Sequence, residues 1–165
     1  KEETGKLQEN LLKSHSVGVG APIDKEISKL MLILKVHTLC MGYSGISLEV
    51  IERICWHIDN NYIPLVPKQG SVGASGDLAP LAHLFLPLIG LGYLTHDNKN
   101  YLPSESVLGE YQLKPINLQA KEGLALINGT QFISAHAIKI SERFSNCLDH
   151  ADLIGALTLE SYLAS

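Results

Sequence analysis

The segment from Ile27 to Cys40 constrains the fold more than any other part of the sequence. Pro22 and Asp24 precede it as helix-start signals, and Asp24 is a candidate N-cap. Its apolar residues occupy nearly every face of the predicted helix: Ile27, Leu30, Met31, Leu32, Ile33, Leu34, Val36, Leu39 and Cys40. A helix that is apolar all round is buried on every side, so we expect a partner or a further segment to cover it.

Length and composition indicate one globular domain. The 165 residues predict a single partial domain over residues 1–165, and 45% apolar against 18% charged residues exclude a disordered chain. The net charge of −4 argues against a nucleic-acid partner. Three widely spaced cysteines favour reduced thiols and a cytoplasmic protein. No CxxC or HExxH pattern is present, so no metal site is predicted.

The remaining pattern predicts a mainly α fold with a short irregular or β connection. Ser47 begins a helix that ends at Asn60 and Asn61, and prolines make residues 62–67 extended. Asp77 is expected to cap the next helix, which Pro87 must kink or end. Residues 95–118 predict a polar connection with at most short strands. A helix over residues 130–148 and a separate last helix from Asp149 or Asp152 follow.

The longest nearly apolar run, residues 78–94, is a poor candidate for a membrane span. It contains Pro80, Pro87 and His83 together with two glycines. The first residues are polar, with no apolar region of a signal peptide. The chain starts at Lys1 and stops within a helical pattern at LESYLAS, so we expect the central segment of a longer protein.

The loop from Gly70 to Asp77 is where chemistry is expected. It is not a P-loop, because no lysine follows its glycines, and it does not match the GxSxG nucleophile elbow. A plain structural turn is one interpretation. The other is that Ala74-Ser75-Gly76 cyclises: the Gly76 nitrogen attacks the Ala74 carbonyl with loss of water, and Ser75 then loses its hydroxyl as a second water. The product is a 4-methylidene-imidazol-5-one, an electrophile made from the backbone.

The residue types suit this cyclisation. Gly76 has no side chain to block its nitrogen, Ala74 is small, and Ser75 supplies the leaving hydroxyl. Asp77 could assist the proton transfers. No standard side chain offers such an electrophilic carbon, and no external cofactor is predicted.

The surrounding sequence resembles a known family. GSVGASGDLAPLAH is similar to the signature of the aromatic amino acid lyases, which include the histidine and phenylalanine ammonia-lyases. NLLKSHSVGVGAPI, GYSGIS, KEGLALINGTQ and LESYLAS follow the family's order and approximate spacing, so the resemblance covers essentially the whole chain. It implies the all-helical lyase fold, a homotetrameric parent protein and an autocatalytic electrophile from Ala74, Ser75 and Gly76.

Within the family, Ser14-His15 resembles the histidine ammonia-lyases. The resemblance implies that the parent eliminates ammonia from L-histidine to give trans-urocanate, the first step of histidine degradation. His15 would bind the substrate's imidazole, and Asn128 would hydrogen-bond near the electrophile and substrate. Without the resemblance, His15 predicts only a loop histidine capping a helix, and Asn128 only a turn. Gln131 and His83 are expected to be structural.

Part of the family pattern lies outside this sequence. The family's tyrosine base precedes the LQENLL segment in a Tyr-Gly-x-Asn-Thr-Gly-Phe-Gly loop, and its later site residues follow LESYLAS. We therefore expect this chain alone to be inactive, with its loop uncyclised. Two alternatives stay open: a phenylalanine or tyrosine ammonia-lyase or aminomutase of the same family, and a non-catalytic helical segment that self-associates.

Overall fold

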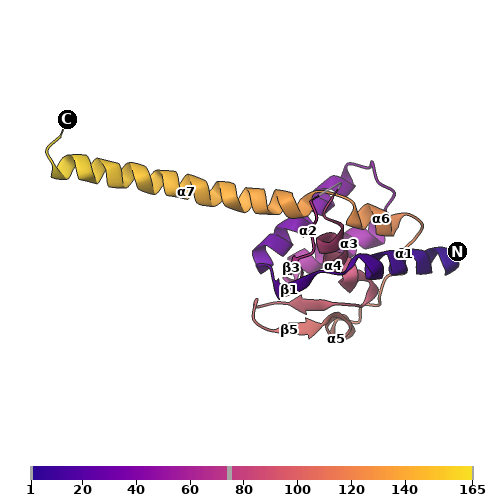
Figure 1. Ribbon diagram of the computed structural model, residues 1–165. Coiled ribbons are helices and arrows are strands. Elements are labelled where there is room, and N and C mark those ends of the chain that lie inside the picture. The colour runs from indigo at the N-terminus through magenta and orange to yellow at the C-terminus, as the bar shows by residue number, and fades with distance from the viewer. Residues whose placement is uncertain (1, 74–75, 165) are drawn as a thin grey trace. The chain divides into compact units, whose positions relative to one another are not determined.

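The computed structural model describes residues 2–73 and 76–164 (Figure 1). The chain forms two compact units, one that extends to Ala135 and one that begins at His136. The mainly α fold expected from the sequence is confirmed. The long helix α7 (Gln131–Ser161) begins in the first unit and continues through the second.

The first unit is built from short helices around one apolar core. They are α1 (Glu2–His15), α2 (Lys25–Cys40), α3 (Leu48–Asp59), α4 (Leu78–Phe85), the 3₁₀ helix η1 (Leu86–Ile89), α5 (Ser104–Glu110) and α6 (Glu122–Ile127). Helix α1 packs on α4 and α6, α4 also packs on α6, and α2 packs on α3. Fully buried Leu12, Met31, Ile54, Phe85 and Leu126 bring α1, α2, α3, α4 and α6 into the same core.

Short strands connect the helices. Strand β1 (Val19–Pro22) pairs antiparallel with β3 (Pro67–Gln69), with an irregularity in the register. Strands β2 (Ile63–Pro64), β4 (Tyr93–Thr95) and β5 (Tyr101–Pro103) form an antiparallel sheet in the order β2-β4-β5. The β1–β3 pair places the segment after α1 beside the start of the glycine-rich loop, because β1 follows α1 and β3 leads directly into that loop.

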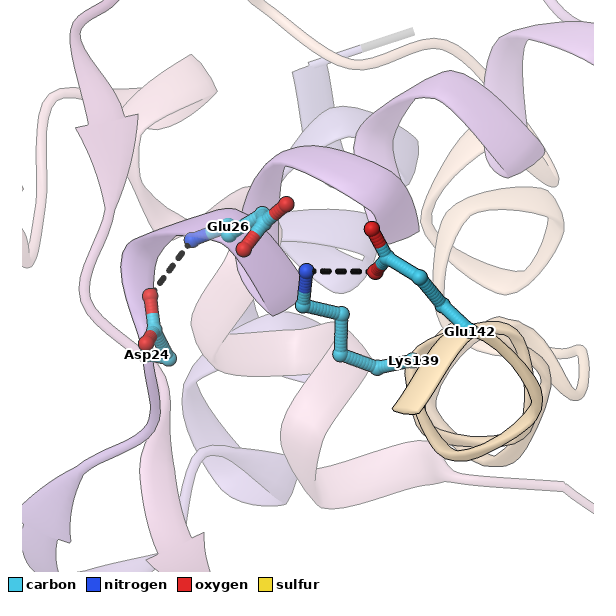
Figure 2. A network of polar contacts seen from close by, with 4 residues as sticks. All are labelled: Asp24, Glu26, Lys139 and Glu142. Carbon is cyan, nitrogen blue, oxygen red and sulfur yellow. Dashed lines mark hydrogen bonds and ion pairs between the residues drawn. The ribbon is translucent and has the colours of Figure 1, made fainter. Parts of the chain in front are cut away.

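Helix α2 begins as predicted but is not buried on every side. The Asp24 carboxylate accepts a hydrogen bond of 2.9 Å from the Glu26 N–H, which caps the helix (Figure 2). Met31, Leu32 and Leu39 lie in the core, whereas Ile33 is 44% exposed. Within the described chain, α2 is therefore buried on one side, and the remaining apolar side chains such as Ile33 are left uncovered. That a partner covers the other side stays a prediction.

The breaks in the helices follow proline and glycine closely. Helix α4 ends at Phe85 and Pro87 lies in the tighter turn of η1, which confirms the predicted interruption. Residues 95–118 contain α5 in addition to the predicted short strands, because Val107 and Leu108 bury one face of that segment. The predicted break near Asp149 is wrong: α7 is continuous, since no proline or glycine stands between residues 130 and 154.

In the second unit, α7 exposes many apolar side chains. More than half of the side-chain surface is exposed at Ile140, Phe144, Leu148, Leu153, Ile154, Leu157 and Leu159. Lys139 and Glu142 form an ion pair of 2.6 Å one turn apart on this helix (Figure 2). Within residues 2–73 and 76–164, no helix combines the length and the apolar character needed to cross a membrane.

Candidate active site

The glycine-rich loop between β3 and α4 is tied together at its two ends. The Ser71 hydroxyl donates a hydrogen bond of 2.8 Å to Asp77 Oδ1, and the same hydroxyl oxygen accepts one of 3.2 Å from the Gly73 N–H. The loop therefore closes on itself across the predicted cyclising tripeptide. Ala74 and Ser75 of that tripeptide lie outside the described residues, whereas Gly76 lies within them.

Asp77 has a different partner from the one predicted. It occupies the position before α4, but among the described residues its side chain makes no capping bond to that helix. The fully buried carboxylate instead accepts the Ser71 hydroxyl and, through Oδ2, the Ile133 N–H at 3.2 Å. The expectation that Asp77 caps α4 is wrong because its carboxylate serves the first turn of α7, where backbone N–H groups lack helical partners.

Gly76 lies against the segment that follows α6. Its φ is +154°, and a Cβ at this position would stand 3.1 Å from the Gly129 carbonyl oxygen and 3.3 Å from Asn128 Oδ1. The Asp77 N–H donates to the same Gly129 oxygen at 3.0 Å. The structure thus brings the predicted cyclising residue Gly76 and the predicted substrate-binding residue Asn128 into contact, across 52 positions of sequence.

His15 lies in the last turn of α1, close in sequence to a second segment that approaches the loop. Its Nδ1 donates to the Leu11 carbonyl oxygen at 2.9 Å, which makes Nε2 the acceptor nitrogen of the neutral ring. Three residues later, Gly18 passes so near the loop that a Cβ at Gly70 would stand 3.0 Å from the Gly18 Cα. The Gly18 N–H donates to His83 Nε2 at 2.9 Å, and burial lowers the pKa of His83.

His83, which was expected only to pack, therefore links α4 to the segment after His15. Together with the β1–β3 pairing, this bond fixes the entry of the loop next to that segment. The contact could not be inferred from spacing, because it joins residues 65 positions apart.

Lys35 is a further polar residue at this site that the sequence analysis missed. It is 1% exposed on α2, and its ammonium donates a hydrogen bond of 2.9 Å to the Asn128 carbonyl oxygen. Burial lowers the pKa of Lys35 to about 8. One signal could have identified it: a lone lysine within the apolar run LMLILKV. A lysine at such a position is rarely buried unless something pairs with it.

Together these residues form a compact arrangement suited to backbone chemistry. Gly76 and Asn128 are in contact, Asp77 lies between the loop and α7, and Gly18 adjoins the start of the loop. Gln131, expected to be structural, is buried and its Nε2 contacts Thr38 Oγ1 at 3.4 Å. Across the described part of the chain, no cluster of three or more His, Cys, Asp or Glu side chains is arranged to hold a metal ion.

Comparison with known proteins defines the class. A model of the aromatic amino acid lyase family matches residues 1–165, and the chain belongs to this family. Human histidine ammonia-lyase is 46% identical over 154 residues, which make up 93% of this chain and 23% of the human enzyme. The crystal structure of histidine ammonia-lyase from Trypanosoma cruzi superposes with a TM-score of 0.90 at 43% identity, covering 99% of this chain and 32% of that one.

A second branch of the family is more distant. Tyrosine aminomutase from Streptomyces globisporus matches with a TM-score of 0.73 at 35% identity, covering 81% of this chain and 24% of that one. The chain therefore spans about a quarter to a third of the length of these relatives.

Proposed function

We propose that this chain is the electrophile-bearing segment of an ammonia-lyase that converts L-histidine to trans-urocanate and ammonia. Ala74, Ser75 and Gly76 form the methylidene-imidazolone by loss of two waters. The single observation that carries the proposal is the close approach of Asn128 and Gly129 to Gly76, because a Cβ at position 76 would stand within 3.1–3.3 Å of their atoms, tighter than ordinary van der Waals contact.

The described residues fit such a group. Gly76 has no Cβ, which allows Gly129 and Asn128 to approach closely. For the same reason its backbone nitrogen is unobstructed, as attack on the Ala74 carbonyl requires. The Ser71–Asp77 bond holds the two ends of the loop near each other, which supports the tight bend. Asp77, buried beside the loop, is the candidate to assist the proton transfers of cyclisation. When present, the group supplies an electrophilic carbon that polarises the substrate's amine as a leaving group.

His15 and Asn128 are the substrate-binding residues of the proposal. With Nδ1 committed to the Leu11 carbonyl, His15 offers Nε2 as an acceptor for the N–H of the substrate's imidazole. Asn128 presents Oδ1 beside Gly76, where it can accept a hydrogen bond from the substrate's amino group.

Histidine is favoured over phenylalanine and tyrosine by two observations. His15 provides a polar partner for an imidazole, whereas a phenyl ring would offer its Nε2 no hydrogen bond from the substrate. Identity is 46% to the human and 43% to the Trypanosoma cruzi histidine ammonia-lyase, against 35% to the tyrosine aminomutase.

The proposal includes a homotetrameric full-length protein and an inactive isolated chain. The exposed apolar side chains of α7, such as Ile140, Phe144 and Leu148, form the kind of surface that self-association covers. The chain by itself is proposed to keep Ala74-Ser75-Gly76 as ordinary peptide, because the packing that compresses the loop comes in part from the rest of the full-length protein.

The test compares the full-length protein with the 165-residue chain. Intact mass and a peptide map across residues 66–84 should show a deficit of two waters at residues 74–76 in the full-length protein, together with urocanate formation from histidine. Phenylalanine and tyrosine serve as alternative substrates. A full-length protein with an unmodified mass and no lyase activity would contradict the proposal and favour the self-associating helical segment. Urocanate formation by the isolated chain would contradict only its proposed inactivity.

A further inference from the structure

Lys35 is a buried charge for which the proposed reaction assigns no role. It lies on α2 with 1% of its surface exposed, among core residues of the first unit such as Met31, Leu32 and Leu39. Burying an ammonium group is strongly unfavourable unless a hydrogen-bonding partner offsets the loss of hydration. Such a residue therefore calls for an explanation beyond packing, since an uncharged side chain of similar length would fill the same space.

The partner of Lys35 is the peptide carbonyl of Asn128. Its Nζ lies 2.9 Å from that oxygen. Asn128 stands just after α6, in extended backbone with φ −89° and ψ 118°, and its own N–H donates to the Leu124 carbonyl at 3.0 Å. Both polar groups of the Asn128 backbone are thus bonded. The bond from Lys35 is charge-assisted, the stronger kind of hydrogen bond in a protein interior.

A second bond from the same helix holds the other end of this segment. Thr38, three residues after Lys35 and on the same side of α2, accepts from Gln131 Nε2 at 3.4 Å. Gln131 is buried, and a Cβ at Gly129 would collide with it at 2.2 Å from Oε1. Residues 128–131 are therefore held against α2 by Lys35 at the start and by Thr38 at the end.

The segment that α2 holds is the one that touches the electrophile loop. Gly129 accepts the Asp77 N–H at 3.0 Å, and Asn128 Oδ1 adjoins Gly76. We propose that Lys35 is a positioning residue: by fixing the Asn128 carbonyl, it sets where the Asn128 amide stands against the electrophile at residue 76. This inference rests on the proposed function, and it adds a role for α2 that neither the motifs nor the loop geometry supplies.

The test uses the full-length protein and changes the donor on Lys35. Lys35→Met keeps the length and removes the charge, so we expect kcat to fall by about 10- to 100-fold, the size of effect that a small misplacement of a catalytic group produces. Lys35→Arg retains a charged donor and should recover part of this loss. Lys29→Met on the same helix is the matched control, because among the described residues the Lys29 ammonium donates to the Asn61 side chain at 3.4 Å and to no atom of residues 128–131, and it should leave kcat unchanged.

Three measurements separate positioning from a merely structural role. The two-water mass deficit gives the fraction of cyclised loops, and kcat is expressed per cyclised loop. Thermal unfolding gives the stability of each variant. In an Asn128→Ala background, Lys35→Met should have little further effect on kcat, because Lys35 acts through Asn128.

The inference is overturned if Lys35→Met folds and retains the wild-type kcat per cyclised loop. It is also overturned if Lys35→Met lowers kcat by the same factor in the Asn128→Ala background. Should the methionine variant not fold, Lys35→Gln, a neutral polar replacement, is judged by the same two criteria. Failure of the proposed function is distinguishable, because it would remove the mass deficit and the activity from the wild-type protein itself.

Discussion

At the scale of single residues, Gly76 is a position where both the backbone conformation and a close neighbour favour glycine. Its φ of +154° disfavours any side chain, and its missing Cβ is what allows the Gly129 peptide to approach. We expect Gly76→Ala in the full-length protein to abolish the two-water mass deficit and reduce lyase activity at least about 100-fold, because the 128–129 segment must move away from the loop. Intact mass and urocanate formation measure the two effects.

Gly73→Ala is the matched control for this change. Gly73 also has a positive φ, +63°, but no atom of the described residues lies within 4 Å of its missing Cβ. Alanine there carries only the backbone penalty, about 1 kcal/mol, so cyclisation should persist. Equal loss in both variants would mean that positive φ alone, and not the contact with Asn128 and Gly129, makes glycine necessary at residue 76.

At the scale of elements, the sequence predicted helix starts and breaks correctly where a single residue determines them locally. Asp24 caps α2 and Pro87 separates α4 from η1 as expected, because capping and the missing proline N–H act within one turn. The break predicted at Asp149 failed because a potential capping residue does not interrupt a helix that nothing else stops. Motif resemblance singled out Gly76 and Asn128, but their contact is tertiary.

Lys35 and the α7 partner of Asp77 escaped prediction for the same reason. Lys35 lies 93 positions from Asn128, and Asp77 lies 56 positions from Ile133. Local patterns contain no information on which distant backbone group a buried charge will meet. A capping residue is assigned from sequence to the helix that follows it, although the fold can bring the start of another helix closer.

Asp77 therefore allows a test at the element scale. We expect Asp77→Ala to loosen the start of α7 and not the start of α4, because the carboxylate accepts from the Ile133 N–H. Loss of such a bond costs about 1–2 kcal/mol. Amide hydrogen exchange should accelerate at Ile133 by roughly 5- to 30-fold. Ser71→Ala serves as control, since it removes the loop's bond to Asp77 and leaves the bond to Ile133. Faster exchange confined to the first turn of α4 would show that Asp77 caps that helix after all.

At the scale of the whole molecule, one buried histidine makes folding depend on pH. His57 on α3 is 1% exposed, and its Nδ1 donates to the Tyr62 carbonyl oxygen at 3.0 Å. Its Nε2 is buried without a hydrogen-bond partner within the described residues. Burial, aided by the nearby Arg53 charge, lowers the pKa of His57 to about 4, although the bond to Tyr62 opposes the shift. An unfolded chain protonates this histidine near pH about 6.5.

Because the folded-state pKa of His57 is below its unfolded value, its contribution to stability is fully present above pH about 6.5. It is lost progressively as the pH falls towards about 4, by up to roughly 3 kcal/mol. Urea unfolding of the chain across this range should show the decline. His57→Asn keeps a donor for the Tyr62 carbonyl without a titrating group, so it should reduce the loss of stability at low pH. His37→Asn, at an exposed histidine, should leave that loss unchanged. An unchanged slope in the His57 variant would mean that other groups, the half-buried His83 first among them, control the acid sensitivity of this fold.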